Sequence, residues 1–153
     1  MAETDAIVIS VNISAGGVPK SPQTSCDVTI DGLIGDGHDH QKHINPDRAI
    51  SLLDREVLDE LNAEGYAVEP GTIGENITVE NLCVNDMNVG DRLCFSGGVE
   101  IELTDPRSPC FVLDAIDPRL KTELVGRAGF LASVTNTGVL APGETIEVRK
   151  TPE

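Results

Sequence analysis

Short runs of alternating apolar and polar residues, separated by turn-forming residues, constrain the fold of this chain most. Alternation over four to eight residues is typical of a β-strand with one buried face, and 15 glycines and 9 prolines are available to end such runs. The pattern predicts a mainly β fold, a compact closed or nearly closed β-barrel, because closure hides the strand edges. We expect strands at residues 6–13, 25–30, 76–79, 92–95, 99–104, 132–134, 138–140 and 145–148.

Two segments are predicted to form a few short helices at the periphery of the barrel. Residues 54–64 begin with an aspartate, place apolar residues on one stripe and stop at Gly65. Residues 110–125 can hold a pair of short helices, of which the second begins at Asp117 and Pro118. These helices are expected to lie outside the strands.

Length and charge limit the class of protein. The 153 residues suit a single domain, 1–153, with a core at about 7–149. The formal net charge of −15, from 26 acidic and 11 basic residues, makes nucleic acid and anionic lipid improbable partners. No apolar run approaches the length of a membrane span, and the N-terminus is acidic and unlike a signal peptide. We therefore expect an acidic cytoplasmic protein with no membrane partner.

Cys110 is the candidate reactive residue. The four cysteines have no C-x-x-C spacing, so we expect reduced thiols. Ser108 suits a helix N-cap and Pro109 the first helical position, which puts Cys110 in a first turn, and Arg107 adds a positive charge. Both features lower a thiol pKa, and the thiolate attacks electrophiles and binds soft metals. The alternative is a small buried cysteine without chemistry.

All three histidines fall within residues 38–43, beside Asp36 and Asp39. Imidazole and carboxylate ligands suit zinc, iron or nickel, although the spacing matches no helical metal motif. The other interpretation is a loop that covers a ligand, to which His38 or His43 donates hydrogen bonds.

Three glycine-containing segments carry further candidates. Lys20 follows Gly16 and Gly17, which suits an anion, and Arg127 stands between two glycines. Asn76 and Thr78 lie where a glycine-rich turn enters a strand. Ordinary turns, local backbone contacts and scattered solvated charges explain these patterns equally well. Five basic residues nevertheless lie in or beside the candidate loops and suggest one pocket for an anionic ligand: Lys20, Lys42, Arg48, Arg107 and Arg127.

Taken in order, these segments resemble the MOSC family, named for the C-terminal domain of molybdenum cofactor sulfurase, and its small stand-alone type in particular. No single segment is decisive, and the ordered set extends from about residue 7 to residue 149. The residues that carry the resemblance are 10–14, 16–20, 32–38, His43, 49–54, 71–79, 89–93, 109–110, 127–130 and 142–148.

The resemblance implies a compact β-barrel that binds the molybdenum cofactor, molybdopterin, a pterin dithiolene that carries a phosphate. Cys110 falls at the family's cysteine, which implies either a persulfide carrier or a thiolate ligand of the metal. From residue type we then expect Lys20, Arg107 and Arg127 at the phosphate or pterin. Asn76 and Thr78 would contact the pterin edge. The implied partners are cofactor-biosynthesis proteins or molybdoenzymes.

Three functions follow from this reading, and they leave open whether the protein is an enzyme. The first is a molybdenum-cofactor-binding module that holds, carries or sulfurates the cofactor through Cys110. The second is a molybdenum-dependent reductase of N-hydroxylated compounds, which would need an external electron donor because the chain has no reductase or iron–sulfur domain. The third is a non-catalytic metal-binding or interaction domain that uses the histidine loop.

Overall fold

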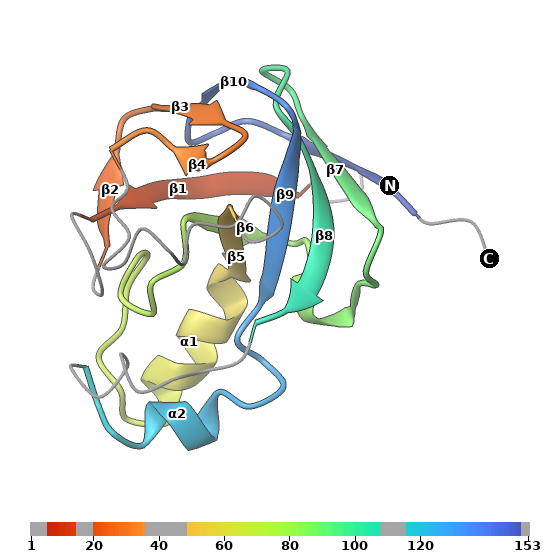
Figure 1. Cartoon of the computed structure of the whole chain (residues 1–153). Helices are drawn as coiled ribbons and strands as arrows, with labels where there is room; N and C mark the ends of the chain where they lie inside the picture. Colours follow the sequence, from red (N-terminus) through yellow and green to blue (C-terminus); the bar gives the residue numbers. More distant parts are fainter. Residues whose placement is uncertain (1–5, 15–19, 36–48, 108–115, 151–153) are drawn as a thin grey trace, which may run out of the picture.

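Two antiparallel-rich sheets make up most of the protein, and the computed structural model describes residues 6–14, 20–35, 49–107 and 116–150 (Figure 1). The larger sheet has the strand order β11-β7-β8-β9-β5-β6-β1-β2, and the smaller one has the order β10-β3-β4. In chain order the described elements are β1 Ile7–Ile13, β2 Ser21–Gln23, β3 Cys26–Thr29, β4 Gly32–Leu33, β5 Ile50–Asp54, α1 Arg55–Ala63, β6 Ile77–Glu80, the 3-10 helix η3 Val84–Asp86, β7 Arg92–Phe95, β8 Glu100–Pro106, α2 Leu120–Glu123, β9 Phe130–Asn136, β10 Gly138–Leu140 and β11 Ile146–Arg149.

The mainly β class is confirmed, whereas the expected closed barrel is not, because both sheets are open in the part that the structure describes. One edge of β1 pairs with β6. The other edge is divided between two partners: residues 11–13 pair with β2, and Ile7 forms only an isolated bridge to Thr145, just before β11. The Val8 N–H donates to the Glu144 carbonyl at 2.9 Å beside that bridge. The Gly143 and Ile146 N–H groups also donate to the Val8 and Ala6 carbonyls at 2.7 and 2.9 Å, but these contacts form no strand ladder, so β11 and β2 remain separate edge strands.

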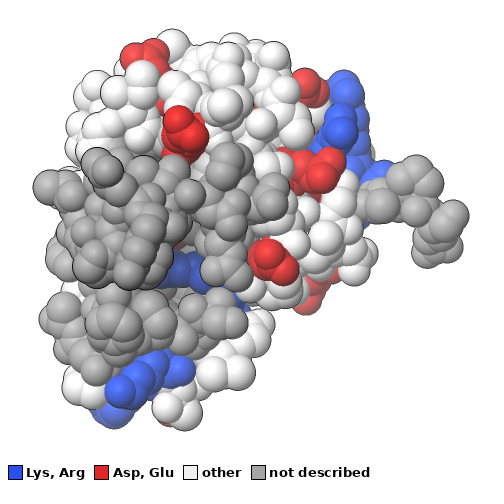
Figure 2. Space-filling model, viewed as in Figure 1, with Lys and Arg blue, Asp and Glu red and all other residues white. Residues whose placement is uncertain are grey.

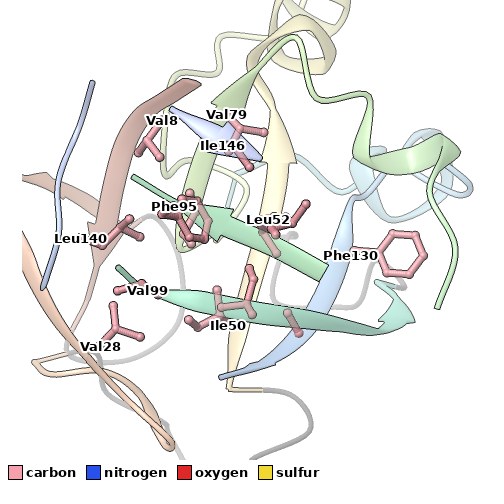
Figure 3. Packing of buried hydrophobic residues seen from close by; sticks show 14 of the residues in the cluster. Val8, Val28, Ile50, Leu52, Val79, Phe95, Val99, Phe130, Leu140 and Ile146 are labelled. Atoms are coloured by element: carbon pink, nitrogen blue, oxygen red, sulfur yellow. The ribbon is translucent and has the colours of Figure 1, made fainter. Parts of the chain in front are cut away.

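The central strand β5 was not predicted, and its burial explains why. It pairs in parallel with β6 and antiparallel with β9, and all five of its residues are buried. Ile50 and Leu52 pack in one apolar cluster (Figure 3), and Leu53 packs in another, because both faces of the strand are covered. A strand that is covered on both faces does not alternate between apolar and polar residues.

The two apolar clusters define two ends of the molecule. The first draws on both sheets, and Figure 3 shows Phe95 and Leu140 within it. The second lies under α1 and α2, which are placed together at the end of the molecule away from β3, β4 and β10 (Figure 1). Within the described segments no helix is both long and apolar enough to cross a membrane.

Candidate functional site

A buried carboxyl group organises the turn that leads into β6. Glu75 is fully buried, and its Oε2 accepts hydrogen bonds from the Gly71 N–H at 3.1 Å and from the Thr78 hydroxyl at 2.9 Å. Its Oε1 is also buried and has no hydrogen-bond partner among the described residues. Burial raises the pKa of the Glu75 carboxyl, while these hydrogen bonds and the charge of Arg107 oppose the shift. The turn is therefore built around a carboxyl group that keeps its proton more readily than an exposed one.

Asn76 and Thr78 belong to the same buried network. The Asn76 Oδ1 accepts the Ser51 N–H at 3.0 Å, and its Nδ2 donates to the Asn12 carbonyl at 3.3 Å. The Thr78 hydroxyl oxygen accepts from the Asn12 Nδ2 at 3.0 Å. Asn76 thus bonds backbone groups that are distant in the sequence, and Thr78 bonds the side chains of Asn12 and Glu75. Contact with a pterin edge stays a prediction.

Lys20 and Arg107 meet at this turn from distant parts of the chain. The Lys20 N–H donates to the Gly71 carbonyl at 2.8 Å, and the Arg107 Nη2 donates to the Ile73 carbonyl at 2.8 Å. The approach is close: a Cβ on Gly71, whose φ is +91°, would lie 2.2 Å from the Lys20 carbonyl oxygen. Of the three described residues of the expected basic pocket, two therefore reach one turn: Lys20 through its backbone N–H and Arg107 through its guanidinium.

Arg127 lies on a different surface, where acidic residues surround it. Its Nη2 is 2.7 Å from Glu64 Oε1, its Nη1 is 3.2 Å from Glu60 Oε1, and Glu123 lies 4.0 Å away. The hydrogen bonds that Arg127 donates to the Glu64 carboxylate lower the pKa of Glu64 and raise the pKa of Arg127. The guanidinium thus ties α1 to the end of α2, and a contact between Arg127 and a cofactor stays a prediction.

A pocket of about 350 Å³ lies next to Arg107, between the end of β8, the η3 turn and residues 125–130. Gly129 connects the three segments that line this pocket. The Gly129 carbonyl accepts the Arg107 N–H at 2.9 Å, and the Gly129 N–H donates to Asn85 Oδ1 at 2.8 Å. A Cβ on Gly129 would lie 1.9 Å from the Leu52 carbonyl oxygen, so only glycine fits here. Figure 2 shows basic side chains in blue between the strand-rich and helical ends of the molecule.

A second recess of about 310 Å³ shares Asn85 and Gly126 with the first, and four acidic residues and Arg127 line it. Asp54, at the N-cap of α1, makes no side-chain cap hydrogen bond. It accepts the N–H groups of Leu82, Cys83 and Val84 at 3.0, 2.7 and 2.8 Å, yet burial still raises its pKa. Cys83 is exposed with a φ of +57°, and desolvation followed by the charges of Asp54 and other carboxylates raises its thiol pKa. This thiol is a poor candidate for the reactive cysteine.

Cys110, His38, His43 and Arg48 lie outside the described residues, as do His40 and Lys42. Their predicted roles therefore stay predictions. Elsewhere in the chain, among the residues that the structure describes, no group of three or more His, Cys, Asp or Glu side chains is arranged to hold a metal ion.

Sequence reasoning missed three residues that shape the site: Asn12, Ser51 and Asn85. Each donates or accepts at a residue far away in the sequence, as Asn85 does at Gly129. Local patterns carry no signal for such contacts. The glycines at positions 71 and 129 were the available indication that backbones approach closely there.

Comparison with known proteins shows the family. The model of the MOSC domain matches residues 39–147, so the chain belongs to the MOSC domain family. A protein from Gibberella moniliformis named as a reductase is 31% identical over 130 residues, which are 79% of this chain and 23% of that protein. The YflK protein of Bacillus subtilis is 28% identical over 141 residues, which are 86% of this chain and 62% of that protein. The chain thus spans less than two thirds of either relative.

Solved structures share the fold at lower sequence identity. The YuaD protein of Bacillus subtilis superposes with a TM-score of 0.82 at 19% identity, covering 97% of this chain and 98% of that one. YiiM from Escherichia coli gives a TM-score of 0.74 at 24% identity, covering 98% of this chain and 72% of that one. YiiM from Geobacillus stearothermophilus gives 0.76 at 23% identity, with 95% and 75% covered. These structures support the architecture alone.

Proposed function

We propose that this protein binds the molybdenum cofactor and that Cys110 is the thiolate that ligates the metal or carries sulfur to it. MOSC domains are associated with molybdenum-cofactor proteins, and this chain is a member of the family. The observation that carries the proposal is that the Lys20 backbone N–H and the Arg107 guanidinium both donate to the turn formed by Gly71–Glu75. Two basic residues at one turn of a strongly acidic protein favour an anionic ligand there.

Chain connectivity limits how far Cys110 can lie from Arg107. It follows Arg107 by three residues, and three residues of fully extended chain span at most about 11 Å. A phosphate-bearing ligand held by Arg107 and Lys20 would therefore lie within reach of the thiol. When bound, the cofactor would supply a soft metal centre that accepts a sulfur ligand.

The buried carboxyl of Glu75 supports anion binding at Arg107. A nearby carboxylate would offset the positive charge of the guanidinium, and burial raises the pKa of Glu75 and so favours its neutral form. The Ile73 carbonyl fixes one Nη of Arg107 and thereby its orientation. In this proposal Lys20 and Arg107 attract the phosphate, and Glu75 shapes the turn behind them.

The test is cofactor analysis of protein purified from cells that make the cofactor. Molybdenum is measured by mass spectrometry and the pterin by fluorescence after oxidation, for the wild type and for Cys110→Ser. Cys83→Ser is the matched control, because Cys83 is an exposed thiol whose pKa is raised by desolvation and nearby carboxylates. We expect the metal to be lost in Cys110→Ser and retained in Cys83→Ser. Full metal loading of Cys110→Ser would refute the ligand role, and a persulfide on Cys110 in the wild type would then identify the carrier role.

A second candidate function is reduction of N-hydroxylated compounds, which the relative named as a reductase favours. This chain spans only 23% of that relative, so the assay supplies the electrons from outside. Cofactor-loaded protein is assayed with a hydroxylamino-purine and a supplied electron donor. Cys110-dependent turnover would support this candidate, and no turnover with several donors would remove it.

A further inference from the structure

The buried polar side chains near Glu75 form a series of hydrogen bonds that runs in one direction and ends on its carboxyl group. The Ser10 hydroxyl donates to Asn12 Oδ1 at 2.5 Å, and Asn12 Nδ2 donates to the Thr78 hydroxyl oxygen at 3.0 Å. Because the Thr78 oxygen accepts that N–H, its own hydrogen is directed at Glu75 Oε2, 2.9 Å away. The Gly71 N–H donates to the same oxygen at 3.1 Å. Two donors are therefore aimed at Oε2.

This arrangement determines which oxygen of Glu75 can carry a proton. A hydrogen on Oε2 would meet the hydrogens of the two donors that this oxygen already accepts. The other oxygen, Oε1, is buried and has no hydrogen-bond partner among the described residues. A negative charge left on such an oxygen costs more free energy than a neutral hydroxyl in the same place. The geometry therefore favours a neutral carboxyl group with its hydrogen on Oε1.

Arg107 is the charged group that acts on this carboxyl. Residues from β1, β5, β6, the end of β8 and the segment before β2 contact Glu75 or its turn: Asn12, Ser51, Thr78, Arg107 and Lys20. The charge of Arg107 lowers the pKa of Glu75 and so opposes its protonation. An anion bound at Arg107 would offset that charge, and protonation of Glu75 would become easier.

We infer that Glu75 is a proton-dependent positioning residue for the anionic ligand at Arg107. With its proton, Glu75 holds the turn through Gly71 and Thr78 and leaves the charge of Arg107 to the ligand. An anion that binds at Arg107 in turn draws a proton from solvent onto Glu75 Oε1. The inference rests on the anion site of the proposed function, but not on the anion being the molybdenum cofactor.

The direct test counts the protons that accompany anion binding. Sulfate is the probe, because it does not titrate between pH 5 and pH 8. It is titrated calorimetrically into the full-length, cofactor-free protein in two buffers with different enthalpies of ionisation. We expect the wild type to take up a fraction of a proton, and Arg107→Gln to lose this binding. Sulfate binding without proton uptake over this pH range, or no sulfate binding at all, would overturn the inference.

Glu75→Gln separates the proton of Glu75 from those of the histidines. It keeps an oxygen for the Gly71 N–H and the Thr78 hydroxyl, and it cannot titrate. Between pH 5 and pH 8 the affinity for sulfate should fall by about threefold or more in the wild type relative to Glu75→Gln. Glu69→Gln is the matched control, because Glu69 is an exposed carboxylate beside the turn, and it should keep the wild-type proton uptake. Equal proton uptake by the wild type and folded Glu75→Gln would contradict the inference.

A second variant serves if Glu75→Gln does not fold. The hydrogen bond from Thr78 lowers the pKa of Glu75, so Thr78→Val should move the proton uptake to higher pH. Proton uptake at an unchanged pH in folded Thr78→Val would count against Glu75 as the group that binds the proton.

Failure of this inference and failure of the proposed function are distinguishable. Normal molybdenum loading, together with sulfate binding that takes up no proton, would remove the coupling to Glu75 alone. Proton-linked sulfate binding by a protein that never carries molybdenum or pterin would support the coupling and remove the cofactor as its ligand.

Discussion

Arg107 and Arg127 were predicted to bind the same ligand, but their surroundings in the protein are very different. Arg107 donates to the Ile73 carbonyl beside a fully buried glutamic acid, in a network of buried polar side chains. Arg127 lies among Glu60, Glu64 and Glu123 on the exposed surface between α1 and α2. The Arg107 guanidinium is directed inward at a buried turn, whereas exposed carboxylates neutralise the charge of Arg127.

The difference follows from burial. In the network around Glu75, a lost partner leaves a buried polar group unsatisfied, which costs the full desolvation penalty. Around Arg127 water replaces any lost partner, so each ion pair contributes little. We therefore expect substitutions near Arg107 to be costly and those near Arg127 to be mild.

The largest expected contrast is between two glycines. In Gly71→Ala the new Cβ would lie 2.2 Å from the Lys20 carbonyl oxygen at a φ of +91°, so we expect a loss of roughly 3 kcal/mol or more in the free energy of unfolding. Gly126→Ala, with a φ of +82° and nothing within 4 Å of the new Cβ, should cost about 1 kcal/mol. Urea unfolding of both variants measures the contrast, and equal losses would refute the close approach at Lys20.

The next contrast concerns the buried amide of Asn12. Its Nδ2 donates to the Glu75 carbonyl at 3.1 Å and to Thr78 at 3.0 Å, so Asn12→Ala leaves two buried acceptors without this donor. We expect a loss of about 2–3 kcal/mol in unfolding free energy. A loss below about 0.5 kcal/mol would show that the network does not hold the turn together.

The pH dependence of stability should reveal Glu75. Burial raises the pKa of its carboxyl in the folded protein, and Arg107 is the charge that opposes this shift. The stabilisation from the bound proton is complete below the ordinary value of 4.5 and is lost as the pH rises through the raised value. Glu75→Gln does not titrate, so its stability relative to the wild type should increase with pH above 4.5. A constant difference in denaturant midpoint from pH 4 to pH 8 would contradict the raised pKa.

The smallest effect is expected at Arg127. Its ion pairs are exposed, so Arg127→Ala should lower the unfolding free energy by less than about 1 kcal/mol, and 0.5 M salt should reduce the difference further. Thermal unfolding at low and high salt measures both effects. A loss as large as that of Asn12→Ala would remove the distinction between the two regions.

The sequence predicted the half-buried strands well because they alternate, as β7 and β8 do with one face in the core. It missed β5, which has apolar clusters on both faces, and β2 and β4, which are only three and two residues long. Closure of a barrel depends on which strand takes the free edge of β1, and no local pattern encodes that choice.

The candidate site was predictable in part for a similar reason. The residue types at Lys20 and Arg107 indicated an anion, and these two residues do meet at one turn. Arg127 has the same side chain between glycines, but its neighbours on α1 are distant in sequence. Residue type indicates which charge is present, whereas only the fold determines which charges neutralise it.

The central claim of the proposed function is that Arg107, and not Arg127, binds the cofactor. The most direct measurement is the pterin and molybdenum content of Arg107→Gln and Arg127→Gln, purified beside the wild type from cofactor-producing cells, with Arg107→Lys to separate charge from geometry. We predict wild-type loading in Arg127→Gln, strongly reduced loading in folded Arg107→Gln and partial recovery in Arg107→Lys. Equal loading of all variants, or a loss confined to Arg127→Gln, would contradict the account.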